Sequence, residues 1–148
     1  MADPMAEFNK KVIDEFRVNG GKLSGQFAAR LGEKLLAGAP MIIVTHKGAK
    51  SGTTYTSPLV HSKDGDKYVI IASKGGAPEN PSWYHNLVAH PEVTLEVGDE
   101  KFRARAQVVK GAERDRLFEQ HASVLPVFRG YVKKTTRVLP VIALERID

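Results

Sequence analysis

Residues 41–72 read MIIVTHKGAKSGTTYTSPLVHSKDGDKYVIIA, and this stretch decides the fold class. Short runs rich in β-branched and aromatic residues predict three strands, at 41–46, 55–61 and 67–72. A glycine-containing turn, KGAKSG, separates the first two runs, and the pair Asp64-Gly65 precedes the third. An Asp-Gly pair between two such runs is a strong hairpin signal. The stretch therefore predicts antiparallel strands that follow one another along the chain.

The remaining sequence extends the same pattern toward the C-terminus. Further strands are predicted at 92–97 and 101–109, which flank a second hairpin signal at Gly98-Asp99, and at 138–144. Helical spacing is found at 82–89 and 112–122, whereas 126–136 is ambiguous. About six strands joined mostly by hairpins, with helices at the margins, predict a mainly β fold and a compact antiparallel barrel.

The N-terminal part of the chain has helical periodicity. Residues 1–20 form an amphipathic pattern whose polar face is basic, and a second helical pattern covers 24–36. The apolar face of residues 1–20 suits either packing on the domain core or contact with a membrane surface, and core packing is the preferred interpretation. We expect one domain over residues 1–148, with the barrel at 41–148.

Composition restricts the chemistry that the chain can perform. The sequence has no cysteine, which excludes disulfides, thiol nucleophiles and cysteine-held clusters. It has neither an apolar signal core at its start nor the roughly 18 consecutive apolar residues of a membrane span. We therefore expect a cytoplasmic protein whose only membrane contact would be peripheral, through the N-terminal helix.

A net charge of +5 favours anionic partners. Nucleic acid is a weak candidate, because the basic residues are scattered and a single tryptophan offers little stacking surface. Two segments, 46–52 and 73–76, instead combine lysine, serine and glycine in a pattern that suits a phosphate group. Loops after alternate strands of an antiparallel barrel lie at one end, so both segments could meet a single anionic ligand.

Other catalytic signatures are missing from the sequence. The five histidines form no compact ligand set, so no metal site is expected. Neither GxSxG nor GxGxxG occurs, which leaves a serine hydrolase and a Rossmann nicotinamide site without support. Trp83 could form the wall of an aromatic ligand site, but a solitary tryptophan is more often a core residue.

Three motifs in fixed order, GAKSG, ASKGG and NPSWYHNL, carry a resemblance to a known family. Over about Phe8 to Leu144 the chain resembles the deazaflavin (F420)-dependent nitroreductases, small split β-barrel proteins related to flavin-binding oxidases. The resemblance implies binding of coenzyme F420, which has a phosphate-linked acidic tail. It also implies hydride transfer to quinones, activated enones or nitroaromatic compounds. Quinone or enone reduction is the preferred interpretation.

The resemblance also implies which residues surround the cofactor and the substrate. Phe128 and Tyr131 would contact the substrate, and Tyr131, Ser73 or a water molecule would donate a hydrogen bond or proton to it. The implied cofactor-binding residues are Ala49, Lys50, Ser51, Tyr55, Ser57, Pro58, Ala72, Ser73, Lys74, Gly75, Gly76, Trp83 and Asn86.

Three questions stay open at the level of sequence. Many members of the family resembled carry arginine where this chain has Tyr55, so binding of the cofactor tail could be weaker or shifted. An FMN-dependent reductase of the same fold, or a cofactor-binding protein without enzymatic activity, would share the phosphate-binding pattern. The residues also do not decide between a monomer and a homodimer.

Overall fold

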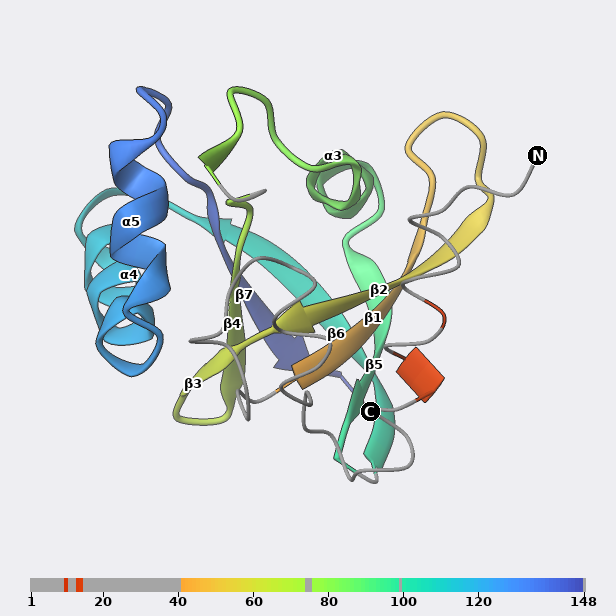
Figure 1. Ribbon diagram of the computed structural model, residues 1–148. Coiled ribbons are helices and arrows are strands. Elements are labelled where there is room, and N and C mark those ends of the chain that lie inside the picture. The colour runs from red at the N-terminus through yellow and green to blue at the C-terminus, as the bar shows by residue number, and fades with distance from the viewer. Residues whose placement is uncertain (1–9, 11–12, 15–40, 74–75, 99, 148) are drawn as a thin grey trace.

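The computed structural model describes residues 10, 13–14, 41–73, 76–98 and 100–147 (Figure 1). Apart from residues 10, 13 and 14, the predicted helices at 1–20 and 24–36 lie outside this part of the chain. Two predicted cofactor residues, Lys74 and Gly75, also lie outside it.

The described residues form one antiparallel sheet with three well-defined helices beside it. The strands are β1 (Met41–Lys47), β2 (Thr54–Val60), β3 (Ser62–Asp64), β4 (Lys67–Ile71), β5 (Glu92–Val97), β6 (Glu100–Val109) and β7 (Val141–Arg146). The helices are α3 (Ser82–Ala89), α4 (Gly111–Val124) and α5 (Val127–Lys133).

The order of the strands makes the sheet curl into a split barrel. That order is β2-β1-β5-β6-β7-β4-β3, so β2 and β3 are the two edges. Only His61 separates these edge strands in the chain, and the two edges must therefore approach each other. The predicted antiparallel barrel is confirmed, and Figure 1 shows α3 across one end and α4 and α5 along one side.

Three details differ from the sequence prediction. The short strand β3 is added, because Ser62–Asp64 pairs with β4 across the Asp64-Gly65 turn. The last strand begins at Val141 and not at 138, since Pro140 has no N–H to donate and the Leu139 carbonyl accepts hydrogen bonds from Arg114. The ambiguous segment 126–136 contains helix α5.

Apolar side chains cover both faces of the central strands. On β1, β4 and β7 successive residues alternate between two buried clusters, which explains why these strands are almost continuously apolar. The α3-side cluster contains Ile42, Val44, Ile70, Ala72, Trp83, Leu87, Val93, Leu95, Phe102, Ala104, Ile142 and Leu144. The α5-side cluster contains Ile13, Met41, Ile43, Val69, Ile71, Leu117, Phe118, Ala122, Leu125, Phe128, Tyr131, Leu139 and Val141.

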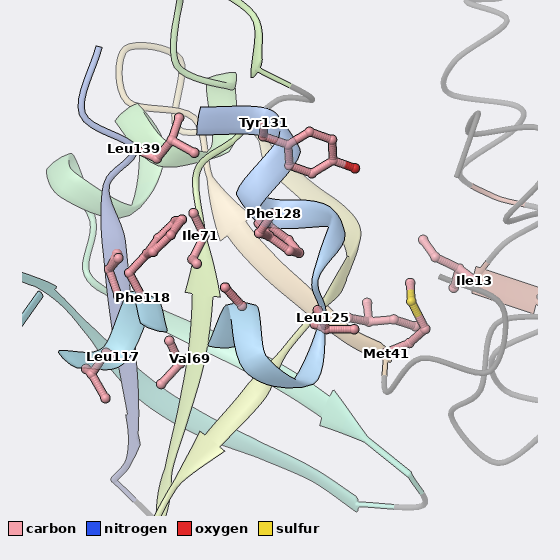
Figure 2. Close-up of a cluster of buried hydrophobic side chains, with 13 residues drawn as sticks. Ile13, Met41, Val69, Ile71, Leu117, Phe118, Leu125, Phe128, Tyr131 and Leu139 are labelled. Carbon is pink, nitrogen blue, oxygen red and sulfur yellow. The ribbon is translucent and has the colours of Figure 1, made fainter. Parts of the chain in front are cut away.

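One residue of the N-terminal pattern belongs to this core. Ile13 is buried in the α5-side cluster, and Figure 2 shows it beside Met41. Lys10 and Asp14 are exposed. The position of Ile13 supports core packing as the role of this apolar face. No helix in the described part of the chain combines the length and apolarity needed to cross a membrane.

Candidate functional site

The predicted binding segments lie at one end of the barrel, around α3. Figure 1 shows the turn between β1 and β2, helix α3 and the chain that leaves β4 together at this end. The side chain of Asn86 on α3 accepts a hydrogen bond from the backbone N–H of Ala49 in the first segment. Asn80, just before α3, is tied to the second segment through Arg137, which bonds both Asn80 and Ser73. Helix α3 therefore connects the two segments.

Glycine geometry shapes the turn between β1 and β2. The N–H of Gly48 donates to the Thr53 carbonyl at 2.8 Å, and the N–H of Gly52 donates to the Gly48 carbonyl at 3.0 Å. Gly52 has a φ of 71°, which side-chain-bearing residues rarely adopt. A Cβ on Gly48 would lie 2.5 Å from Oγ of Ser51 and 3.1 Å from the Tyr55 ring, so the Ser51 side chain would have to rotate away. Gly52 is therefore a conformational requirement of this turn, and Gly48 allows the Ser51 hydroxyl to fold over it.

A chain of hydrogen bonds ties the turn to α3 and to β2. The N–H of Ala49 donates to Oδ1 of Asn86 at 2.8 Å. Nδ2 of Asn86 lies 3.1 Å from Nδ1 of His46, and Nε2 of His46 lies 2.9 Å from Oγ of Ser57. Burial lowers the pKa of His46, which favours its neutral form. Asn86, predicted as a cofactor residue, thus positions the first segment.

Several donors on the first segment face solvent. Lys50 and Ser51 are exposed at the tip of the turn, and Oγ of Ser51 accepts a hydrogen bond from the Thr53 N–H at 3.2 Å. Tyr55 is 46% exposed, with its ring 6.0 Å from that of His46. Lysine ammonium and serine hydroxyl groups suit an anionic oxygen ligand.

Ser57 and Pro58 were predicted to line the same cofactor path, but they lie on opposite faces of β2. Neighbouring residues of a strand point to opposite sides of the sheet. Ser57 pairs with Val44 and points to the α3 side, where it meets His46. Pro58 pairs with Ile43 of the α5-side cluster. Of the two, only Ser57 is placed with the residues around α3.

Arg137 organises the second predicted segment. Its guanidinium donates to the carbonyls of Ala72 at 3.1 Å, Ser73 at 2.8 Å and Ala77 at 2.8 Å, and to Oδ1 of Asn80 at 2.6 Å. These groups lie between the end of β4 and the start of α3. The side chain thus replaces sheet hydrogen bonds where the chain leaves β4.

Gly76 lets the second segment pass close to α5. It has a φ of 86°, and a Cβ there would lie 2.7 Å from Cβ of Lys134 and 2.9 Å from the Tyr131 carbonyl oxygen. The absence of a side chain is therefore required by the packing of α5. Ser73 is buried, and its carbonyl accepts the Gly76 N–H at 2.9 Å.

The predicted aromatic residues are largely buried. Trp83 is 8% exposed and belongs to the α3-side cluster, as the preferred core interpretation states. Phe128 and Tyr131 project from α5 into the opposite cluster with their rings edge to face at 5.2 Å (Figure 2). Tyr131 adjoins Gly76 through its backbone, whereas Phe128 packs against the ring of His121. The structure thus groups Tyr131 with the second segment.

Sequence reasoning included His46 in the first segment without giving it a role, and it missed Arg137. A signal for His46 was available, because it continues the inward-facing alternation of Ile42 and Val44, and a buried polar residue needs a partner. No sequence signal identifies Arg137, whose partners are more than 50 residues away. Within the described ranges, no three side chains of histidine, aspartate or glutamate gather as metal ligands.

Comparisons with known proteins identify the family of this chain. The model of the F420H2-dependent quinone reductase family matches residues 16–146. An F420H2-dependent quinone reductase of Mycobacterium tuberculosis is 36% identical over 120 residues, which are 79% of this chain and 80% of the relative.

Solved structures give the same result. An F420-H2 dependent reductase, FDR-A, is 36% identical with a TM-score of 0.67 over 72% of this chain and 94% of its own. A structure described as a domain-swapped dimer is 28% identical with a TM-score of 0.68, and the match covers 97% of this chain and all of that one. With matching family, sequence and fold, this chain belongs to the F420H2-dependent quinone reductase family.

Proposed function

We propose that this chain transfers a hydride from F420H2 to a quinone at the end of the barrel that α3 covers. The oxidoreductase class and the F420H2 reductant follow from membership of the family, which also favours F420 over FMN. The observation that carries the proposed location is the turn between β1 and β2, which exposes Lys50 and Ser51 beside the Asn86 anchor.

The residues at this end fit an anionic deazaflavin. Lys47 and Lys50 are exposed on the first segment, and the chain has a net charge of +5. A phosphate-linked acidic tail would receive charge-assisted hydrogen bonds from such groups, which are stronger than bonds between neutral partners. We assign the tail to the first segment and the redox ring to Ala72, Ser73 and Gly76, with Lys74 and Gly75 between them in the sequence.

When bound, F420H2 supplies the hydride, so the protein needs little acid-base machinery of its own. The residues of this chain bind the cofactor and orient it. Asn86 and Arg137 hold the two segments in place, and Trp83 anchors α3 by packing into the α3-side cluster. Ser73 belongs to the second segment and Tyr131 adjoins it, and either hydroxyl would donate to an oxygen of the substrate on which charge develops. Phe128 would form part of the substrate wall.

The test is a titration of the purified protein with F420 and with FMN, followed by the fluorescence of Trp83 and by calorimetry. We expect F420 to bind and FMN to bind at least 10-fold more weakly, a difference of about 1.4 kcal/mol. Oxidation of F420H2 would then be followed with menadione, an enone lactone and a nitroaromatic compound, and we expect menadione to be reduced fastest. Failure to bind F420 in both assays would refute the proposal, and binding without turnover would indicate a carrier protein.

Assembly forms a second part of the proposal. A relative at 28% identity is described as a domain-swapped dimer, and we propose a homodimer for this chain as well. Light scattering across a concentration series tests this, and a monomer mass throughout would contradict it.

Peripheral membrane contact through residues 1–20 stays a prediction, for which co-flotation with quinone-containing vesicles is the test.

A further inference from the structure

The hydrogen bonds that join Ala49, Asn86, His46 and Ser57 have a defined direction. A backbone N–H can only donate, so the Asn86 atom that faces Ala49 at 2.8 Å must be the carbonyl oxygen. If the amide were rotated by half a turn, its NH2 group would face another donor. The Asn86 NH2 group therefore points at Nδ1 of His46, 3.1 Å away.

The direction continues through the imidazole. Because Asn86 donates to Nδ1 of His46, that nitrogen must be unprotonated, and the proton of the neutral ring lies on Nε2. Nε2 then donates to Oγ of Ser57 at 2.9 Å. The ring is only 3% exposed, and burial lowers its pKa, so the neutral form is favoured.

The last member of the chain is Ser57. Its oxygen accepts from His46, so its own proton is directed elsewhere. In the described part of the chain, Ser57 has no acceptor for that proton. The side chain is half-buried on β2, on the same strand face as the exposed Tyr55 two residues away, and it is therefore partly accessible to a ligand.

We propose that Asn86 and His46 are positioning residues that direct the Ser57 proton away from the His46 ring, so that the hydroxyl donates to an acceptor oxygen of the cofactor. The chemical class of that acceptor is a phosphate, carboxylate or carbonyl oxygen. The bond from His46 occupies one of the two lone pairs of Ser57 Oγ and keeps the Ser57 proton from bonding back to the ring, so that proton is free to bond an acceptor oxygen. The identity of the ligand rests on the proposed function, whereas the direction of the relay rests on the ligand-free protein.

The first experiment reads the relay without any ligand. Long-range proton–nitrogen NMR of the ¹⁵N-labelled protein distinguishes a protonated from an unprotonated imidazole nitrogen, and His46→Gln assigns the signals. We expect His46 to carry its proton on Nε2 alone. In Asn86→Asp the carboxylate can accept from Ala49 but cannot donate, so we expect the proton to move to Nδ1. A wild-type ring protonated on Nδ1 would overturn the proposal.

The second experiment measures F420 affinity by calorimetry at a pH at which NMR shows His46 to be neutral. We expect Ser57→Ala and Asn86→Asp each to bind F420 about 10-fold more weakly, as loss of a hydrogen bond to a charged group implies. The double variant should lose little more than either single variant, because both act through one hydroxyl.

His46→Gln keeps an NH2 donor toward Ser57, so it should bind within about threefold of the wild type. Thr56→Ala is the matched control, since Thr56 is an exposed neighbour on the other face of β2. If Asn86→Asp does not fold, the F420 affinities of Ser57→Ala and His46→Gln and the wild-type NMR spectrum still test the relay.

The outcomes separate this inference from the proposed function. If the wild type binds F420 and neither Ser57→Ala nor Asn86→Asp weakens it, the relay proposal is wrong and the function stands. If the wild type shows the expected ring protonation but does not bind F420, the proposed function fails while the relay direction holds.

Discussion

The stability of this protein should fall steeply between about pH 6.5 and pH 4, because His121 is buried in a neutral form. The ring lies on α4 and is completely inaccessible. Its Nδ1 lies 2.7 Å from Oγ of Ser62, and its edge-on contact with the Phe128 ring spans 4.4 Å between centroids. Nε2 has no hydrogen-bond partner in the described part of the chain.

The size of the effect follows from the pKa of His121. Burial, and to a smaller degree the nearby His61, lowers this pKa from 6.5 to about 4. The unfolded chain therefore takes up a proton first as the pH falls, and protonation draws the equilibrium toward the unfolded state. Stability from this group is complete above pH 6.5 and is lost toward pH 4. At about 1.4 kcal/mol per pKa unit the loss approaches about 3 kcal/mol, a large share of the 5–15 kcal/mol of a typical domain.

The assay is urea unfolding at a series of pH values from about 7.5 to 4.5, followed by the fluorescence of the single tryptophan. The double variant His121→Leu with Ser62→Ala removes the titrating ring and its polar partner together, which leaves no buried polar group alone. We expect the pH slope to shrink by about 2–3 kcal/mol over this range. Part of the slope should remain, since burial also lowers the pKa of His46.

His85→Gln, at an exposed histidine of α3, is the matched control and should keep the wild-type slope. Ser62→Ala alone should also keep it, because the ring remains buried. An unchanged slope in the double variant would refute the argument, since the acid sensitivity would then arise elsewhere.

Three further perturbations test the architecture of the site. Gly76→Ala should cost more than about 2 kcal/mol in urea unfolding, because strain at a φ of 86° adds to the clash with α5. Gly65→Ala, at a φ of 59° with open space around it, should cost less, and equal costs would contradict the close packing. Lys50→Ala should weaken F420 binding by about 1–3 kcal/mol in calorimetry without lowering the melting temperature. Lys101→Ala, on the exposed face of β6, is its control, and equal losses in both would indicate only general charge attraction. Arg137→Ala should destabilise the fold by about 2–4 kcal/mol and expose the second segment to limited proteolysis, because three carbonyls lose their donor. Unchanged proteolysis would show that this arginine does not hold the segment.

The strands and α3 could be predicted because their signals are local. Alternation in 92–97 and 101–109 follows from one face being buried, and the structure places Arg103 and Arg105 on the exposed face of β6. Prolines at both ends bound α3 at 82–89. In contrast, β3 has only three residues, too few for a periodic pattern, and it forms because the Asp64-Gly65 turn folds it onto β4.

The candidate site was predictable only in part, because only some of its features have a signal in neighbouring residues. Glycine, lysine and serine in 46–52 indicate a tight, basic turn without reference to the rest of the chain, and the structure contains that turn. The burial of Phe128 and Tyr131 depends on which side of α5 faces the sheet, and a seven-residue helix has too few turns to show this by periodicity.

The sequence by itself determined the fold class, the antiparallel order of neighbouring strands and the basic turn, because each depends on residues close together in the chain. The tertiary structure decided how distant groups meet. Asn86 reaches His46 across 40 positions, and Arg137 reaches Ser73 across 64. Such contacts form only after the sheet has curled, when a buried polar group must find whichever partner the packing brings within reach. The basic turn of the first segment thus follows from the sequence, but its connection to α3 and to Ser57 depends on the closure of the barrel.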